Sequence, residues 1–363
     1  MMYSSELNAI KKSNRLRDTQ LCEPGLVDFA SNDYLGFSEI DSLLDRTYEE
    51  IKKYKSHAPK SSQMVNGYQS IHKNFEDYLS KINSFESAIT AGSGFLANLA
   101  LIESLPRKKD LLILDSEYHA SGILASKLVD AKVEKFEHND MKNLEEILQQ
   151  NRAKRVIVAV EGIYSMSGDL LKREIFELCE KYKFLLIVDE AHSVGVVGDR
   201  LLGVFDLFDV KPTKYHIKMG TLGKAMGSYG AYILCSSHIR EYLVNRAKSL
   251  IYATAPSLFD IELARQGFIY MDENLKRLKD EIGKRREIIY RFFGFEMAGL
   301  IFSLELNSSV EALTLQKKLK DLGFIVAAIR PPTVSKPILR IIPRLGASVN
   351  KLETVCRFLV STK

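Results

Sequence analysis

Residues that can carry out acid–base or anion-binding chemistry follow four separate apolar runs of the sequence. They are Asp115 with His119, Glu161 with Ser165, Asp189 with His192, and Thr221 with Lys224. Each pair alone is a weak signal, but apolar runs separated by helical patterns predict parallel strands. Ligands bind at the carboxyl ends of the strands in an open α/β sheet, so we expect these side chains to share one site.

Lys224 lies in the glycine-rich segment GTLGKAMGSYG, residues 220–230. So many glycines indicate a backbone that turns sharply or approaches a ligand closely. Taken alone, a lysine in such a loop is more often simply exposed to solvent. A desolvated lysine amine, in contrast, loses its proton easily and then forms imines or acts as a base.

Asp189 follows the apolar segment FLLIV and is therefore expected to be buried. It is either a helix cap or ion-pair partner, or the acceptor for the protonated ring nitrogen of a pyridinium cofactor. His192 is either a satisfied loop histidine or part of the site. His119 either packs against the protein or lies over a planar ring.

The segment Gly92-Ser93-Gly94-Phe95 could present backbone N–H groups to a phosphate at the start of a helix. It lacks the third glycine of a dinucleotide-binding fingerprint. A glycine pair of this kind is by itself a weak signal.

The apolar periodicity predicts strands at 111–115, 156–160, 184–189, 215–219 and 231–235, and helices at 141–150 and 172–183. This alternation predicts an α/β fold with a mostly parallel sheet covered on both faces. After a charged helical stretch at 257–295, we expect a strand at 300–306, a helix at 313–322, strands at 324–329 and 339–342, and a helix from 349. We therefore predict an N-terminal arm (1–39), a large α/β domain (40–255), and a linking helix with a smaller C-terminal α+β domain (256–363).

The chain has 363 residues, 46% of them hydrophobic, and a formal net charge of +5. It contains no run of about 18 apolar residues that could span a membrane. The four cysteines form no C-x-x-C pair, and the polar start of the chain is no secretory signal. We therefore predict a cytoplasmic protein without a membrane span, a nucleic-acid partner or a metal site. A mildly basic surface would also suit an acidic substrate or a carrier protein.

Seven segments, taken in order, resemble the α-oxoamine synthases, a family of fold-type I pyridoxal-phosphate enzymes. They are FASNDYLGF (29–37), GSGFLAN (92–98), DSEYHAS (115–121), EGIYSMSGD (161–169), VDEAHSVGVVG (188–198), GTLGKAMGSYGA (220–231) and LIYATAPS (250–257). The combination is highly specific because several spaced motifs must agree. It implies pyridoxal 5'-phosphate as the cofactor and a homodimer with its site at the subunit interface.

The resemblance also implies a role for each matched residue. Lys224 would bind the cofactor covalently, Asp189 would hold its ring nitrogen, His192 its ring oxygen, and His119 would stack on the ring. Further contacts to the cofactor or its phosphate would come from Gly94, Phe95, Ser165 and Thr221, and from Thr254 across the subunit interface. Arg340 would bind the amino-acid carboxylate as a bidentate fork, for which lysine is a poor substitute. Arg17 and Thr333 would contact the acyl substrate.

The implied reaction joins an amino acid to an acyl thioester with loss of carbon dioxide. Segments 234–254 and 328–334 look most like the branch of the family that uses L-alanine and a pimeloyl thioester, carried by coenzyme A or an acyl carrier protein, in biotin biosynthesis. The alternative is glycine with acetyl-CoA, or another pair of amino acid and acyl-CoA used by this family. The sequence departs from the family pattern at KSSQMVNGY (60–68), in the short loop 333–340, and in the abbreviated stretch 296–301.

Other classes of protein are also compatible with parts of the sequence. The segment LLIVDEAH (185–192) is similar to the acidic box of a helicase, but the phosphate-binding G-x-x-x-x-G-K-[ST] loop that an NTP-driven enzyme needs upstream is missing. A metal hydrolase built on Asp189 and His192 lacks a third ligand at a recognisable spacing. A non-catalytic binding protein with the same fold stays open.

Overall fold

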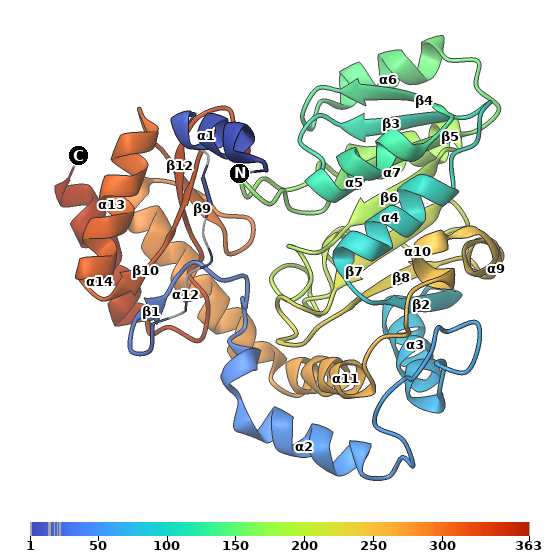
Figure 1. Ribbon diagram of the computed structural model, residues 1–363, viewed down its shortest axis with the longest axis horizontal. Coiled ribbons are helices and arrows are strands. Elements are labelled where there is room, and N and C mark those ends of the chain that lie inside the picture. The colour runs from blue at the N-terminus through green and yellow to red at the C-terminus, as the bar shows by residue number, and fades with distance from the viewer. Residues whose placement is uncertain (1, 14–15, 18, 20, 22, 363) are drawn as a thin grey trace.

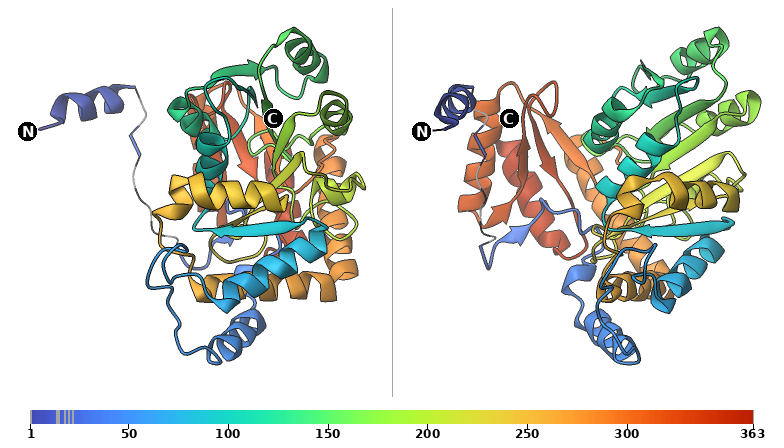
Figure 2. Two further views of the ribbon diagram at one scale, coloured as in Figure 1. Left: turned by 90° about the vertical axis from the view of Figure 1, so that its right-hand side faces the viewer. Right: turned by 45° about the vertical axis from the view of Figure 1, so that its right-hand side comes forward.

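The computed structural model describes residues 2–13, 16–17, 19, 21 and 23–362. Figure 1 shows a large body built around one wide sheet and a smaller body that contains the C-terminal elements. Two long helices, α11 (Leu258–Glu273) and α12 (Leu275–Phe293), connect the two bodies. The N-terminal helix α1 (Ser4–Lys12) buries none of its residues and stands away from the large body in Figure 2.

The large body is built on a seven-stranded sheet with the strand order β2-β8-β7-β6-β5-β3-β4. The strands are β2 (Ser87–Ala91), β3 (Leu111–Asp115), β4 (Lys132–Phe136), β5 (Val156–Glu161), β6 (Leu185–Asp189), β7 (His216–Thr221) and β8 (Ala231–Cys235). Strand β8 runs antiparallel to both of its neighbours, and all other neighbours pair in parallel. The central strands are buried along nearly their whole length, as expected for a sheet covered on both faces.

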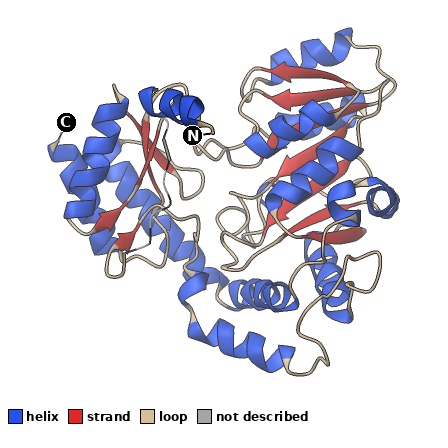
Figure 3. Cartoon of the chain, in the orientation of Figure 1, coloured by secondary structure: helices blue, strands red, loops and turns tan. Residues whose placement is uncertain are grey.

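Helices cover both faces of this sheet (Figure 3). One hydrophobic core joins the sheet to α4 (Gly94–Ser104), α5 (Ala120–Ala125), α9 (Ser237–Arg246) and α10 (Lys248–Ile251). The other core joins the opposite face to α3 (Ser70–Asn83), α6 (Met141–Gln150), α7 (Glu174–Tyr182) and α11. Successive residues of β6 point into opposite cores, since Leu186 and Val188 enter one and Ile187 enters the other.

The smaller body contains an antiparallel sheet in the order β11-β12-β9. Its elements are β9 (Phe302–Glu305), α13 (Ser309–Asp321), β11 (Ala327–Ile329), β12 (Ile338–Ile341) and α14 (Val349–Ser361). Strand β1 (Val27–Asp28) pairs in parallel with β10 (Phe324–Ile325), and Phe29 lies in the core of this body. Part of the predicted N-terminal arm therefore packs with the C-terminal elements. The chain then enters the large body through α2 (Asp41–Ile51), and the division at residues 39 and 255 stays a prediction.

The structure confirms the predicted α/β class, with a mostly parallel large sheet and a smaller α+β part. The five strands predicted for the large sheet all form, two of them with the predicted bounds and three with ends that shift by one or two residues. The prediction omits β2 and β4. The sequence of β4, KVEKF, carries charges at most positions because the strand lies at the edge of the sheet and is largely exposed. No helix within the described ranges is both long and apolar enough to cross a membrane.

A buried ion pair fixes the loop that follows β6. Lys218 in β7 is fully buried, and its amine lies 3.7 Å from a carboxylate oxygen of Glu190. The same amine donates a hydrogen bond to the side-chain oxygen of Asn83 at 2.8 Å. Glu190 in turn accepts the backbone N–H of Val204 at 2.8 Å and the hydroxyl of Ser193. Because either charge alone would be buried without a counter-ion, the pair holds the loop that starts at Glu190 against the sheet.

Candidate active site

The carboxyl ends of β5, β6 and β7 bring predicted site residues to the same edge of the sheet. Glu161 is in register with Asp189, and Asp189 is in register with Met219, two residues before Thr221. In-register residues of neighbouring parallel strands point to the same face, so the side chains of Glu161 and Asp189 are neighbours. Their exposed fractions are only 1% and 4%. Two carboxyl groups thus form the buried floor of the site.

Asp189 is held by two N–H donors. The side-chain amide of Asn98 in α4 donates to Oδ2 at 2.8 Å, and the backbone N–H of Ala191 donates to Oδ1 at 3.0 Å. Asn98 is itself fixed by the hydroxyl of Tyr118, which donates to its side-chain oxygen at 2.6 Å. These contacts suit an ionised carboxylate, which only accepts hydrogen bonds. A buried negative charge of this kind favours a cationic group on a bound ligand.

Lys224 lies half-buried on the loop after β7, within reach of His192. The Lys224 amine is 2.7 Å from Nε2 of His192. On its other side the imidazole is hydrogen-bonded through Nδ1 to the hydroxyl of Tyr34, and both His192 and Tyr34 are buried. This chain of three polar groups fixes the position of the amine.

Burial shifts the pKa values of Lys224 and His192 in this hydrogen-bonded group. It lowers the pKa of Lys224 to about 8, and the negative charge of Asp189 opposes part of that shift. The pKa of His192 lies well below its ordinary value because the ring is buried and because the charge of Lys224 acts on it. His192 is therefore neutral near pH 7, while a fraction of Lys224 has lost its proton, as a lysine nucleophile requires.

His119 joins the same network through Ser121. The backbone N–H of Ser121 donates to Nδ1 of His119 at 3.2 Å, and the Ser121 hydroxyl lies 2.7 Å from the same atom. Asn98, which donates to Asp189, also donates to the Ser121 hydroxyl at 3.0 Å. The His119 ring is exposed, so its face is available to a planar ligand. Stacking on the cofactor stays a prediction.

The start of α4 lies beside Thr221. Ser93 caps the helix by accepting the backbone N–H of Leu96 at 3.2 Å. In the described structure, the backbone N–H groups of Gly94 and Phe95 have no hydrogen-bond partner. A Cβ atom on Gly94 would lie 3.7 Å from the side chain of Thr221, so the helix start and the end of β7 are neighbours. Free N–H groups at a helix start favour an anion such as a phosphate.

Arg340 reaches the site from β12 of the smaller body. Its side chain is buried, and Nη2 donates to Oδ1 of Asn32 at 2.5 Å. Its Nε is also buried and has no hydrogen-bond partner among the described residues. A buried polar atom without a partner is unfavourable by about 1–3 kcal/mol, and more for a charged group. The free Nε therefore marks a position for an anionic ligand, and a carboxylate fits the guanidinium geometry.

The remaining predicted site residues differ in burial and in their contacts. They are Ser165, Thr254, Arg17 and Thr333. Ser165 is buried, and its backbone N–H donates to Oε2 of Glu161 at 3.1 Å. Thr254, Arg17 and Thr333 are exposed. Within the described part of the chain, no hydrogen bond or ion pair joins these three to the group around Lys224. Their roles stay predictions.

Four polar residues of the site carry no role in the sequence-based prediction: Tyr34, Asn32, Asn98 and Glu161. All four lie inside the segments FASNDYLGF, GSGFLAN and EGIYSMSGD, so membership of those motifs is the signal that could have found them. The strand-end argument does point to Glu161. Nothing in the apolar periodicity indicates that segment 29–37 comes to the carboxyl edge of the sheet.

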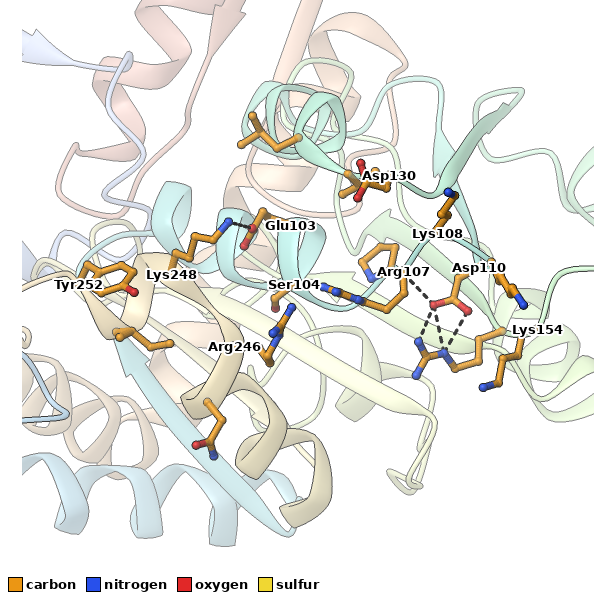
Figure 4. A pocket seen from close by; sticks show the side chains of 17 residues that line it. Glu103, Ser104, Arg107, Lys108, Asp110, Asp130, Lys154, Arg246, Lys248 and Tyr252 are labelled. Carbon is orange, nitrogen blue, oxygen red and sulfur yellow. Dashed lines mark hydrogen bonds and ion pairs between the residues drawn. The ribbon is translucent and has the colours of Figure 1, made fainter.

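A cleft of about 620 Å³ lies at the opposite, amino edge of the sheet (Figure 4). Basic side chains such as Arg107, Lys108 and Lys154 line it. These residues precede β3 and β5, whereas the candidate site follows those strands. None of the predicted site residues lines this cleft, so it is no part of the candidate active site.

The groups at the carboxyl edge fit pyridoxal 5'-phosphate. Asp189 offers a buried carboxylate to a protonated ring nitrogen, and the start of α4 offers N–H groups to a phosphate. Lys224 offers an amine of lowered pKa to an aldehyde. The free Nε of Arg340 offers a position for the carboxylate of an amino acid. Fold and site together define a fold-type I pyridoxal-phosphate enzyme.

Comparison with known proteins places the chain in the same class. The family model for class I and II aminotransferases matches residues 24–359. A solved serine palmitoyltransferase from S. paucimobilis has a TM-score of 0.89 at 21% identity, over 99% of this chain and 96% of that chain, which shows the shared fold. The crystal structure of 8-amino-7-oxononanoate synthase from Francisella tularensis is 28% identical with a TM-score of 0.77, over 94% of this chain and 98% of that chain.

Relatives with higher sequence identity indicate to which group of pyridoxal-phosphate enzymes the chain belongs. The 8-amino-7-oxononanoate synthase of Helicobacter pylori is 40% identical over 362 residues, which cover 99% of this chain and 97% of the relative. The enzyme of the same name from Lysinibacillus sphaericus is 35% identical over 336 residues, covering 90% of this chain and 86% of the relative. The chain belongs to the α-oxoamine synthase family, in the group formed by these 8-amino-7-oxononanoate synthases, and is a pyridoxal-phosphate-dependent enzyme that transfers an acyl group.

A charged histidine clamps the loops beside the site. Nδ1 of His138 is 3.1 Å from Asp115, and Nε2 is 3.1 Å from Asp169. Asp115 ends β3 just before the His119 segment, and Asp169 ends the segment that contains Ser165. Burial opposes protonation of His138, but the hydrogen bonds to the two carboxylates outweigh it and raise the pKa to about 10.

The ion pairs of His138 with Asp115 and Asp169 should stabilise the fold less in alkaline solution. The folded-state pKa of His138 is raised, so its contribution is complete below the unfolded value near 6.5 and is lost as the pH rises through about 10. The difference in unfolding free energy between the wild type and His138→Gln should therefore shrink between about pH 7 and pH 10 in denaturant titrations. A difference that stays constant or grows over this range would contradict the clamp.

Proposed function

We propose that this enzyme joins L-alanine to a pimeloyl thioester with loss of carbon dioxide and so makes 8-amino-7-oxononanoate for biotin biosynthesis. The thioester is carried by coenzyme A or by an acyl carrier protein. The proposal is carried by the Lys224 amine and the Asp189 carboxylate at the carboxyl edge of the sheet and by the free Nε of Arg340, whose charge acts on both Lys224 and His192. The names of the relatives support this choice of substrates within the family.

The residues around Lys224 can perform the proton transfers of this reaction. When bound, pyridoxal phosphate supplies an electron sink for negative charge at the amino-acid Cα. Lys224, with a pKa of about 8, would hold the cofactor through its aldehyde, and its free amine would accept the Cα proton of the amino acid. Asp189 would hold the proton on the ring nitrogen, while neutral His192 keeps the Lys224 amine in place. A positioned proton-transfer group contributes about 10²–10⁴-fold to the rate.

Arg340 orients the amino acid in this proposal. Its guanidinium binds the substrate carboxylate, and Asn32 holds the guanidinium at 2.5 Å. Fixing the carboxylate determines which bond of Cα faces Lys224, and orientation of this kind lowers the entropic barrier. A bond would then form between Cα and the thioester carbonyl carbon while the thiolate leaves and takes up a proton. Loss of the carboxylate as carbon dioxide would leave its electron pair on Cα, where a second proton would be added.

The homodimer, the cytoplasmic location and the contacts of Thr254, Arg17 and Thr333 belong to the same proposal. Thr254 is assigned to the phosphate site of a second subunit, and Arg17 and Thr333 to the acyl substrate. All three are exposed on the single chain, as groups that act across an interface or on an incoming substrate must be.

The substrate pair is tested by a panel of glycine, L-alanine and L-serine against acetyl and pimeloyl thioesters. Product masses identify each pairing, and the proposal predicts the highest kcat/KM for L-alanine with a pimeloyl thioester. The groups around Lys224 would act in the same way on every pair of substrates. The panel therefore tests the choice of substrates and not the mechanism. Preference for glycine with acetyl-CoA would contradict the substrate assignment.

Replacing Lys224 with alanine tests the covalent role of the amine. The variant should lose the visible absorbance of the lysine–cofactor imine and turnover together, because no other amine has a hydrogen bond to His192 in the described structure. Lys108→Ala, which removes an exposed lysine at the opposite edge, is the matched control and should keep both. Circular dichroism checks that both variants are folded. An absorbing, active Lys224→Ala enzyme would rule out the assignment.

Replacing Arg340 with lysine tests the carboxylate site. Lysine keeps the positive charge but lacks the paired N–H donors of the guanidinium. The KM for the amino acid should therefore rise about tenfold or more, as expected for the loss of a charged hydrogen bond. The KM for the acyl thioester should change little, since the free Nε is assigned to the amino acid alone. Steady-state kinetics with each substrate varied gives both values. An unchanged KM for the amino acid would contradict the role.

A further inference from the structure

Glu161 is a second acidic group in the floor of the site, and no step described above uses it. The residue is 1% exposed and lies in register with Asp189. Its Oε2 accepts the backbone N–H of Ser165 at 3.1 Å. Its Oε1 is buried and has no hydrogen-bond partner among the described residues. A buried polar atom is rarely without a hydrogen bond, so we expect a ligand to supply the partner of Oε1.

The surroundings of Glu161 disfavour a second negative charge beside Asp189. Asp189 has an N–H donor on each oxygen, whereas Glu161 has one donor in all among the described residues. Burial and then the charge of Asp189 raise the pKa of Glu161 well above its ordinary value. Two adjacent carboxyl groups that cannot both ionise hold a proton between them. The hydrogen-bond pattern assigns that proton to Glu161.

We propose that Glu161 is a neutral carboxylic acid whose Oε1–H donates a hydrogen bond to a polar atom of the bound cofactor and so helps to seat the ring above Asp189. This inference rests on the proposed function, because it needs the cofactor in the site. The neutral form leaves Asp189 as the single negative charge of the floor. It also gives the buried Oε1 atom a hydrogen-bond partner.

An ionised Glu161 would behave differently, and the difference is measurable. Glu161 lies near enough to Lys224 for a carboxylate charge there to favour the protonated lysine. Removal of such a charge would lower the pH midpoint of the lysine–cofactor imine. A neutral Glu161 exerts no such effect, and glutamine can replace it because its amide has a similar shape, no charge and an N–H donor.

The test compares the wild type, E161Q and E161L, each loaded with pyridoxal phosphate. Spectrophotometric titration gives the pH midpoint of the imine band, and equilibrium dialysis gives the cofactor dissociation constant. The proposal predicts the wild-type midpoint and affinity for E161Q. It predicts cofactor binding about tenfold weaker for E161L, which cannot donate, as expected for the loss of one hydrogen bond.

Two results would overturn the inference. A midpoint about one unit or more lower in E161Q would mean that Glu161 is ionised in the wild type. Wild-type cofactor affinity in E161L, with or without a lower melting temperature, would mean that Oε1 makes no contact with the cofactor. An unfolded E161L leaves the E161Q midpoint as the deciding measurement. A wild type without any imine band would instead refute the proposed function itself, and the two failures are therefore distinct.

Discussion

The buried charge of Asp189 is the constraint on which the rest of the site depends. A carboxylate that is 4% exposed is unfavourable unless other groups compensate it. Asn98 and the N–H of Ala191 supply part of that compensation. The proposed function assigns the rest to a cationic ring nitrogen of the cofactor. The same charge acts on its neighbours, since it moderates the lowered pKa of Lys224 and contributes to the raised pKa of Glu161. Burial and this one charge thus act together on the pKa values of Lys224 and Glu161.

The sheet alone does not complete the site, because the smaller body contributes Arg340, which the proposed function assigns to the substrate carboxylate. Arg340 lies on β12, and Asn32, which binds it, follows the β1 strand that pairs with β10. Two residues later, Tyr34 holds the imidazole of His192. The N-terminal segment therefore links the smaller body to the loop after β6. Its position follows from the core around Phe29 and from the contact of Phe37 with Tyr270 in α11.

The sequence predicts those parts of this arrangement that follow from local pattern. Apolar runs predict β5, β6 and β7, and the rule that parallel strands end at one edge is enough to bring Asp189 and Lys224 together. The antiparallel direction of β8 and the charged edge strand β4 are set by neighbours in space, so periodicity does not reveal them. The contact between Tyr34 and His192 spans 158 residues and depends on how two bodies pack, for which no local pattern exists. The roles proposed for Thr254 and Thr333 involve a second subunit and a substrate, which a single chain does not contain.

The central claim is that one amine, on the loop after β7, binds the cofactor covalently. Its most direct test is reduction of the pyridoxal-phosphate-loaded protein with borohydride, followed by proteolysis and peptide mass mapping. The account predicts a single modified peptide that carries the phosphopyridoxyl group on Lys224, because burial lowers the pKa of this amine to about 8. A label spread over exposed lysines, or one found on any other residue, would contradict it.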